Sequence, residues 1–222
     1  MDSAVLQLLV LAGIAIFLVL RLKSVLGSRE GFEKPPLPEN RAESAGISHR
    51  PEFEVIEGGP DTDITDYVEE GSKQAEALAE MKRVDPDFHV GDFLNGARQA
   101  YEMILMAFES GDMDALVPFL SRDVYESFME VVEIREREGL TVEAAFVGLR
   151  DVRILNAYLD PETSEAEITI RFDAELTSVV RNSEGEIVEG DPNEIKRQKD
   201  VWTFARDLSR DDPNWQLVAT GE

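Results

Sequence analysis

The hydrophobic period of this chain changes near residue 141, and that change constrains the fold more than any other feature of the sequence. Upstream, in "GDFLNGARQAYEMILMAFESGD" (91–112), apolar side chains recur every three or four residues. Downstream, "EAEITIRFDAELTSVV" (165–180) alternates strictly between apolar and polar residues. The first period is typical of an amphipathic helix and the second of a strand with one buried face. Helices followed by antiparallel strands predict an α+β domain with the helices against one sheet face.

Three helices are expected before the period changes. The first spans about 92–110, with Asp92 able to cap its start and Gly111 to end it. A short helix is expected at 113–120, and a third from 121 to 139. One apolar stripe is expected on the third helix, made of Val124, Phe128, Val131 and Val132.

The alternating segment predicts the best-defined strand of the sheet. Its buried face is expected to carry Ile168, Ile170, Phe172, Ala174 and Leu176. Its solvated face is expected to carry Thr169, Arg171, Asp173, Glu175 and Thr177. Further strands are expected at 150–159, 199–208 and 214–220, with 186–194 as an acidic loop or distorted hairpin tip. About three helices packed on a bent antiparallel sheet would form a cone-shaped domain.

The first 26 residues predict a membrane anchor. Residues 4–20 are apolar except for Gln7, and as a helix they would rise roughly 26 Å, close to the hydrocarbon thickness of a bilayer. No basic segment precedes the run, as it would in a cleavable signal, so we expect the span to be retained. Arg21, Lys23 and Arg29 follow it, which predicts an outside N terminus and a cytoplasmic C-terminal domain. A buried core helix or an interfacial helix is the alternative, but the run has no polar stripe.

Residues 27–85 are interpreted as an acidic, proline-rich tether that precedes a domain at 86–222. Five of the ten prolines fall between 27 and 63, where aliphatic side chains are sparse, so disorder is expected. Within the tether, 64–84 has loosely helical apolar spacing. It predicts either an amphipathic helix that docks on a membrane or partner, or a frayed lead-in helix on the domain surface. The narrow apolar face favours the second interpretation.

The charge and cysteine content restrict the partners and the chemistry. A formal net charge of −24 repels nucleic-acid phosphates and anionic lipid headgroups, so no nucleic-acid partner is expected and basic proteins are the natural counterparts. There is no cysteine, which excludes disulfides, zinc–thiolate sites and cysteine nucleophiles. We predict no catalytic residue, no metal site and no cofactor.

The sequence allows two alternatives to a purely structural core. In the first, the cone is an enzyme in which Tyr101 acts with Asp173, Trp202 or Phe204, but the alternation places Asp173 on the solvated face. In the second, the cone binds a lipid or another small molecule. The side chains expected to line either that pocket or an ordinary core are Tyr101, Phe108, Trp202 and Phe204.

Two segments taken together resemble the mitochondrial inner-membrane import-motor scaffold, the subunit-forty-four type of translocase, in its C-terminal domain. They are "FLNGARQAYEMILMAFESGDMDALVPFLSRDVYESF" (93–128) and "DVWTFARDLSRDDPNWQLVAT" (200–220), and the most specific part is Trp202 to Arg206 followed by Asp212 to Trp215. The resemblance covers about 86–220. It implies a nuclear-transport-factor-like cone and a non-enzymatic, inner-membrane adaptor, whose mitochondrial members tether a chaperone to the import channel.

The combined expectation is a bacterial, single-pass inner-membrane adaptor with a cytoplasmic Tim-like domain. Its partner is expected to be a protein, such as a chaperone or another part of a translocation or membrane-protein biogenesis machinery. The span at 4–20 stands in for the lipid-binding helices of the mitochondrial members, so chaperone recruitment is not carried over. The last strands, ending at Thr220, leave an edge at which a homodimer is a further prediction.

Overall fold

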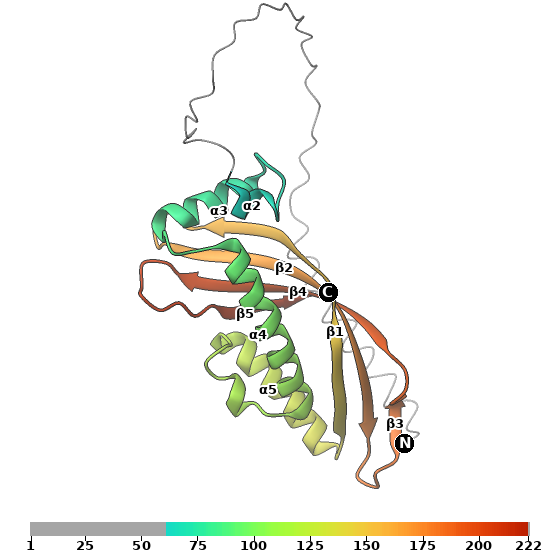
Figure 1. The fold of residues 1–222 in the computed structure, drawn as a ribbon. Helices are drawn as coiled ribbons and strands as arrows, with labels where there is room; N and C mark the ends of the chain where they lie inside the picture. The colour runs from blue at the N-terminus through green and yellow to red at the C-terminus, as the bar shows by residue number, and fades with distance from the viewer. Residues whose placement is uncertain (1–60, 222) are drawn as a thin grey trace, which may run out of the picture. The chain divides into compact units, whose positions relative to one another are not determined.

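Strands and helices form two layers, with the helices against one face of a bent antiparallel sheet (Figure 1). The structure is a computed structural model that describes residues 61–221. Within them the sheet contains β1 (Thr141–Leu159), β2 (Glu165–Arg181), β3 (Ile187–Gly190), β4 (Lys196–Asp207) and β5 (Gln216–Gly221). The strand order is β1-β2-β4-β5, and β3 pairs with the end of β2. The predicted α+β class with a bent sheet is therefore confirmed.

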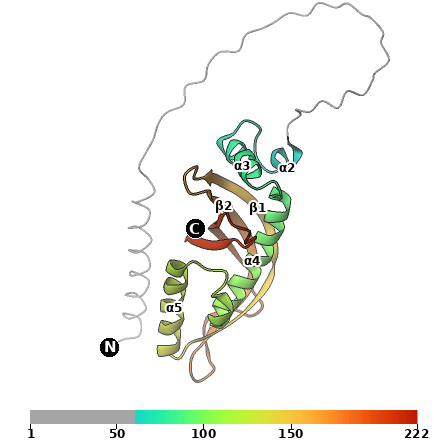
Figure 2. The same cartoon turned by 90° about the vertical axis from the view of Figure 1, so that its left-hand side faces the viewer.

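The helices are α2 (Thr62–Thr65), α3 (Lys73–Val84), α4 (Val90–Ser110), the 3-10 turn η1 (Asp114–Leu116) and α5 (Arg122–Arg137). In Figure 1, α4 crosses the sheet, with α2 and α3 at its N-terminal end and α5 beside its C-terminal half. Figure 2 shows the same helices from the side. The concave face of the sheet is thus covered by α4 together with α3, and both helices pack on β1.

The predicted first and third helices are confirmed, and their ends explain most of the agreement. Gly111 ends α4 in the left-handed region with φ 78°, a conformation that favours glycine. Ser121 caps α5 by accepting a hydrogen bond from the Val124 amide. The expected cap Asp92 is wrong, because α4 begins at Val90 and its first amides are capped by Asp63 from α2.

Two helical details differ from the sequence prediction. The segment expected to be a short helix at 113–120 contains only the three-residue turn η1. Val131, which was placed on the buried stripe of α5, is 39% exposed, whereas Val124 and Val132 are buried. The stripe is narrower than expected because α5 contacts the rest of the domain along one edge, near β5 and the end of α4.

The alternation in β2 is confirmed by its burial. The five residues predicted to face the core are at most 3% exposed. β2 lies between β1 on one side and β4 on the other, with Ile170 opposite both Ile154 and Trp202. It is therefore the central strand of the sheet.

β1 begins nine residues earlier than the strand expected at 150. Register shifts interrupt its pairing with β2 between Phe146 and Gly148, between Leu149 and Asp151, and again after Ile154. Each bulge adds a residue that breaks the period of two and bends the strand. The same irregularity that curves the sheet thus hides the first half of β1 from a search for alternation.

The packed core extends N-terminally beyond the expected domain boundary at residue 86. Ile64 of α2 and Ala75, Leu78 and Met81 of α3 are buried in the same core as the sheet. The three α3 residues recur every third position, and α3 contacts β1, so a narrow stripe is enough to pack this helix on one strand. The segment 64–84 is therefore part of the domain and not a frayed surface helix.

The predicted anchor and most of the tether lie outside the described residues. This applies to the span at 4–20, to the membrane-flanking residues Arg21, Lys23 and Arg29, and to residues 27–60. Among residues 61–221, no helix combines the length and the apolar character needed to cross a membrane.

Candidate functional site

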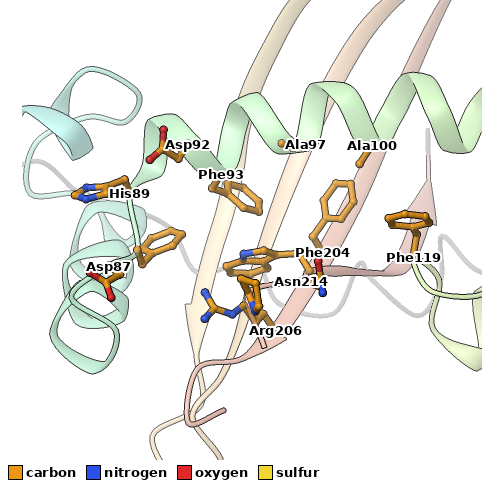
Figure 3. Close-up of a pocket in the computed structure, with 14 residues that line it drawn as sticks. Asp87, His89, Asp92, Phe93, Ala97, Ala100, Phe119, Phe204, Arg206 and Asn214 are labelled. Carbon is orange, nitrogen blue, oxygen red and sulfur yellow. The ribbon is translucent and has the colours of Figure 1, made fainter. Parts of the chain in front are cut away.

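A groove lined by aromatic side chains opens between the N-terminal half of α4, the end of β4 and the loop before β5 (Figure 3). We call it the aromatic groove, and its volume is about 360 Å³. Its aromatic lining consists of Phe88, Phe93, Phe119, Phe204 and Trp215. Polar side chains around its rim are Asp87, His89, Asp92, Arg206 and Asn214.

Four aromatic rings of the groove, those of Phe88, Phe93, Phe204 and Trp215, form one connected cluster. Phe93 lies 4.6 Å from Trp215 and 6.3 Å from Phe204, the latter in an edge-to-face arrangement, measured between ring centroids. Phe88 completes the cluster at 5.9 Å from Trp215. Phe93 and Phe204 are buried and form the floor, whereas Trp215 and Phe119 are only half-buried and form walls. Such a surface suits one or two apolar side chains of a ligand.

The position of Trp215 is fixed by a polar clamp at Arg206. The guanidinium pairs with Asp85 at 2.9 Å and donates from Nε to the Asp212 carbonyl at 2.8 Å. The Asp212 carboxylate accepts from the Asn214 backbone amide and from its side chain. Arg206 and Asp85 are only 13% and 15% exposed. Their pair joins the end of β4 to the turn between α3 and α4, and the Nε hydrogen bond holds the loop before β5 to the same side chain.

The first turn of α4, which forms one side of the groove, is held by Asp63. Its carboxylate accepts from the amides of Val90 at 2.9 Å and Gly91 at 3.1 Å, and it pairs with Lys82 at 3.0 Å. Burial acts to raise the pKa of Asp63, but these donors outweigh it and the pKa is lowered overall. A carboxylate 27 residues away in sequence thus caps the helix that carries Phe93.

The four side chains predicted to line a pocket or core do not lie together in one place in the structure. Tyr101 is fully buried and stacks on Phe172 at 4.4 Å, with Trp202 at 4.7 Å. Phe204 belongs to the same cluster and is also on the floor of the aromatic groove. Phe108 lies two turns further along α4, where it contacts Phe128 and the Arg135 guanidinium. Three of the four residues therefore meet, and one of them lines the groove.

The acid that meets Tyr101 is Asp200 and not Asp173. The Tyr101 hydroxyl donates to Asp200 Oδ2 at 2.5 Å, and Gln198 Nε2 donates to the same oxygen at 2.8 Å. Burial and this carboxylate raise the pKa of Tyr101. Asp173 lies on the opposite face of the sheet, 3.3 Å from Arg171. Asp200 lies two residues before Trp202, so the period of a strand could have placed it on the buried face.

Most groove residues were not predicted as a site. Phe88, Phe93 and Phe119 come from three separate helical or turn segments, and their meeting depends on tertiary packing. Arg206, Asn214 and Trp215 were noted only as parts of the motif that carries the family resemblance. That motif is the sequence feature that indicates this site, because it brings a cation and aromatic residues together on either side of one turn.

Together, the fold and the groove define a small α+β binding domain with an apolar recess and a polar rim. The chain belongs to the Tim44-like domain family, which matches residues 74–222. This assignment confirms the family resemblance found around Trp202 to Arg206 and Asp212 to Trp215.

Relatives with established names agree with this family. The mitochondrial import inner membrane translocase subunit TIM44 of Homo sapiens is 29% identical over 160 residues, which is 71% of this chain and 35% of the relative. The probable mitochondrial import inner membrane translocase subunit tin-44 of Caenorhabditis elegans is 24% identical over 148 residues, 65% of this chain and 34% of the relative. The matched region thus spans about a third of these relatives.

Among solved structures, the intermembrane space region of the chloroplast protein ARC6 covers 56% of this chain and 94% of that chain, with a TM-score of 0.36 and 9% identity. That likeness is too low to inform the function.

Proposed function

We propose that the protein is a membrane-attached adaptor whose Tim44-like domain holds a protein of a translocation machinery close to the membrane. The related TIM44 proteins are translocase subunits of the mitochondrial inner membrane. The observation that carries the proposal is the aromatic groove, because the motif residues Arg206, Asn214 and Trp215 meet there. The domain acts by binding and has no enzymatic role.

The partner segment is a basic, amphipathic stretch of polypeptide. One or two apolar side chains enter the groove and contact Phe93 and Trp215, which leaves neighbouring lysines or arginines near the exposed carboxylates of Asp87 and Asp92. The net charge of −24 attracts such a segment over a longer range. Apolar contact thus supplies affinity, and charge supplies selection and a faster encounter.

Attachment to the membrane is through the apolar run at 4–20, as a single span with Arg21, Lys23 and Arg29 on the cytoplasmic side. We propose the inner membrane of a bacterium, with the N terminus outside and the Tim44-like domain in the cytoplasm. A flexible tether raises the local concentration of the domain at the bilayer to about the millimolar range, so a weak contact is sufficient. Alkaline carbonate extraction should leave the full chain in the membrane pellet, and recovery in the supernatant contradicts the span.

A second candidate ligand for the same groove is a lipid acyl chain or another small apolar molecule. It is favoured by the volume of about 360 Å³, which falls in the range of small-molecule sites. Native mass spectrometry of the gently purified full chain distinguishes the two candidates. A retained ligand of constant mass supports the small molecule, and its loss in Trp215→Ala would place it in the groove.

The binding experiment uses the full chain in detergent and a fluorescent, helical peptide with leucines along one face and lysines along the opposite face. Trp215→Ala should weaken binding at least about tenfold, the effect typical of a central aromatic contact. The matched control is Tyr158→Ala, because Tyr158 is 52% exposed on β1 and lies outside the groove lining. Equal affinities for the two variants would exclude the groove as the peptide site.

A further inference from the structure

β4 is longer than its neighbour β5, and this leaves a stretch of sheet edge uncovered. β4 runs from Lys196 to Asp207, but its pairing with β5 covers only Val201 to Ala205. On its other side β4 is paired with β2 down to Lys196, which is opposite Leu176. Within residues 61–221, therefore, the stretch 196–199 has a strand on one side only. We call this stretch the open β4 edge.

A hollow of about 780 Å³ lies along the open β4 edge. Besides β4 itself, its walls are formed by Glu109 at the end of α4 and by Leu176 and Ser178 of β2. The hollow borders the open β4 edge on the α4 side of the sheet, and the backbone groups of that edge form one half of a strand ladder. An unpaired edge of this kind accepts an extended peptide through main-chain hydrogen bonds.

The open β4 edge is basic in a strongly acidic chain. Its sequence is Lys196-Arg197-Gln198-Lys199, while the chain as a whole carries −24. The Arg197 side chain is 72% exposed, and it shares the single carboxylate of Glu175 with Arg150. Lys199 is exposed and stands opposite Asp173, whose carboxylate already faces Arg171. Lys196 faces Glu109 at the end of α4, whereas Arg197 and Lys199 are exposed and carry the positive charge of this edge to solvent.

We propose that the open β4 edge binds an extended, acidic segment of a partner protein as an additional strand. The segment continues the line of β5 and runs antiparallel to β4. Acidic side chains at alternate positions would lie beside Arg197 and Lys199, at the spacing of cross-strand pairs. A second copy of this chain is the less favoured occupant, because pairing two such edges would bring three cations on each strand together.

This site is separate from the aromatic groove. Gln198 and Phe204 are six residues apart in β4, a distance of about 20 Å along a strand. The two sites also select opposite chemistry, since one has acidic residues on its rim and the other is basic. The domain would then hold two different partner segments at once, which goes beyond the proposed function.

The decisive test examines backbone pairing with the unaltered full chain. The probe is a fluorescent eight-residue peptide of alternating glutamate and valine, measured by fluorescence anisotropy. Two further peptides carry N-methyl groups on alternate amides, one on the odd and one on the even positions. In strand addition only one set of amides faces β4, so one peptide should lose at least about tenfold in affinity and the other should bind within about twofold. No binding of the parent peptide, or equal binding of both methylated peptides, overturns the proposal.

The second test examines charge. Arg197→Gln with Lys199→Gln should weaken binding of the acidic peptide by roughly tenfold, since each cross-strand charge pair contributes up to about fivefold. Lys73→Gln with Arg83→Gln changes the net charge equally at exposed positions of α3 and is the matched control. Equal losses in both variants would indicate non-specific attraction and overturn the site.

Two controls keep this test separate from the aromatic groove and from folding. Trp215→Ala should leave binding of the acidic peptide unchanged, so failure of the groove proposal does not affect this one. If the variant at 197 and 199 does not fold, the N-methylated peptides still decide the question on the unaltered protein. Sedimentation without peptide should give the same mass for the parent chain and the variant at 197 and 199. A dimer found only in the parent would identify a second copy as the occupant and overturn the acidic partner.

Discussion

The two faces of β2 come from one alternating sequence but are held by different forces. On the concave face, Ile168, Ile170 and Phe172 are fully buried against α4 and its neighbours. On the convex face, Arg171 pairs with Asp173 of the same strand and with Asp151 of β1. Glu175 pairs with Arg150 of β1 and with Arg197 of β4. Burial of apolar surface contributes about 25 cal/mol per Å², whereas partly exposed ion pairs contribute little. The concave face should therefore determine the stability of the domain, and the convex face its surface charge.

The convex face is also less solvated than alternation alone indicates. Arg171 and Asp173 are only about one-third and one-quarter exposed in their side chains. Asp151 Oδ2, Arg171 Nε and Asp173 Oδ1 are buried atoms without a hydrogen-bond partner, although all three take part in ion pairs. Poorly aligned, partly desolvated ion pairs recover little of the hydration free energy that their charges lose on burial. Substitutions on the concave face should therefore reduce the free energy of unfolding much more than substitutions on the convex face.

The largest effect is expected for Phe172→Ala on the concave face. Loss of a fully buried ring that stacks on Tyr101 should reduce the free energy of unfolding by about 3–5 kcal/mol. Urea unfolding of the full chain, followed by tryptophan fluorescence, measures this because Trp202 and Trp215 are the only tryptophans and both lie in the domain. Thr169→Ala is the convex-face control and should lose less than about 1 kcal/mol. Similar losses would refute the contrast between the faces.

The next effect concerns a polar contact at a helix end. Asp63→Ala removes the cap of α4 and one partner of Lys82, and should reduce the free energy of unfolding by about 2 kcal/mol. The pKa of Asp63 is lowered in the folded state, so its contribution is present above the unfolded pKa and is lost as the pH falls through the folded value. The difference between variant and parent should thus shrink in acid. Asp66→Ala, at an exposed position of the same segment, should have no comparable effect.

A smaller effect is expected where a polar group enters the concave face. Tyr101→Phe keeps the ring but removes the hydroxyl that donates to Asp200, and should reduce the free energy of unfolding by about 1–2 kcal/mol. The loss should exceed that of Tyr125→Phe, an aromatic residue of α5 that is only partly buried. An unchanged midpoint in urea would mean that the hydrogen bond to Asp200 adds nothing to stability.

The smallest effect is expected for Asp173→Asn on the convex face. Its ion pair with Arg171 is partly exposed, so the free energy of unfolding should change by less than about 1 kcal/mol. Any change should diminish further at high salt, because screening weakens the pair. A loss comparable to that of Phe172→Ala would show that the charged face, too, holds the fold together.

The sequence predicts elements whose signals are local. The alternation in β2, the apolar stripe of α4 and the helix ends at Gly111 and Ser121 depend on neighbouring residues, and all four are found in the structure. The bulged half of β1 was missed because its irregular residues break the period of two.

Features that depend on distant residues were not predictable in the same way. The α4 cap at Asp63 comes from another helix, and the aromatic groove combines Phe88, Phe119 and Trp215 from separate segments. Asp200 is an exception, because a residue two positions before Trp202 on one strand is expected on the same face of the sheet. Sequence periodicity thus reports which face a side chain occupies, but not which distant residue it meets.

The attachment of α2 has a mechanical consequence. The described residues begin at Asp61, and both Asp61 and Asp63 hold Lys82, while Asp63 also holds the start of α4. Tension applied to the polypeptide upstream of Asp61 would load these polar contacts and the buried Ile64 before it reached the sheet. If they yielded, the first turn of α4, beside Phe93, would lose its support while the strands stayed intact. Pulling on the chain upstream of α2 would in this way weaken the hold of the aromatic groove on a ligand without unfolding the sheet.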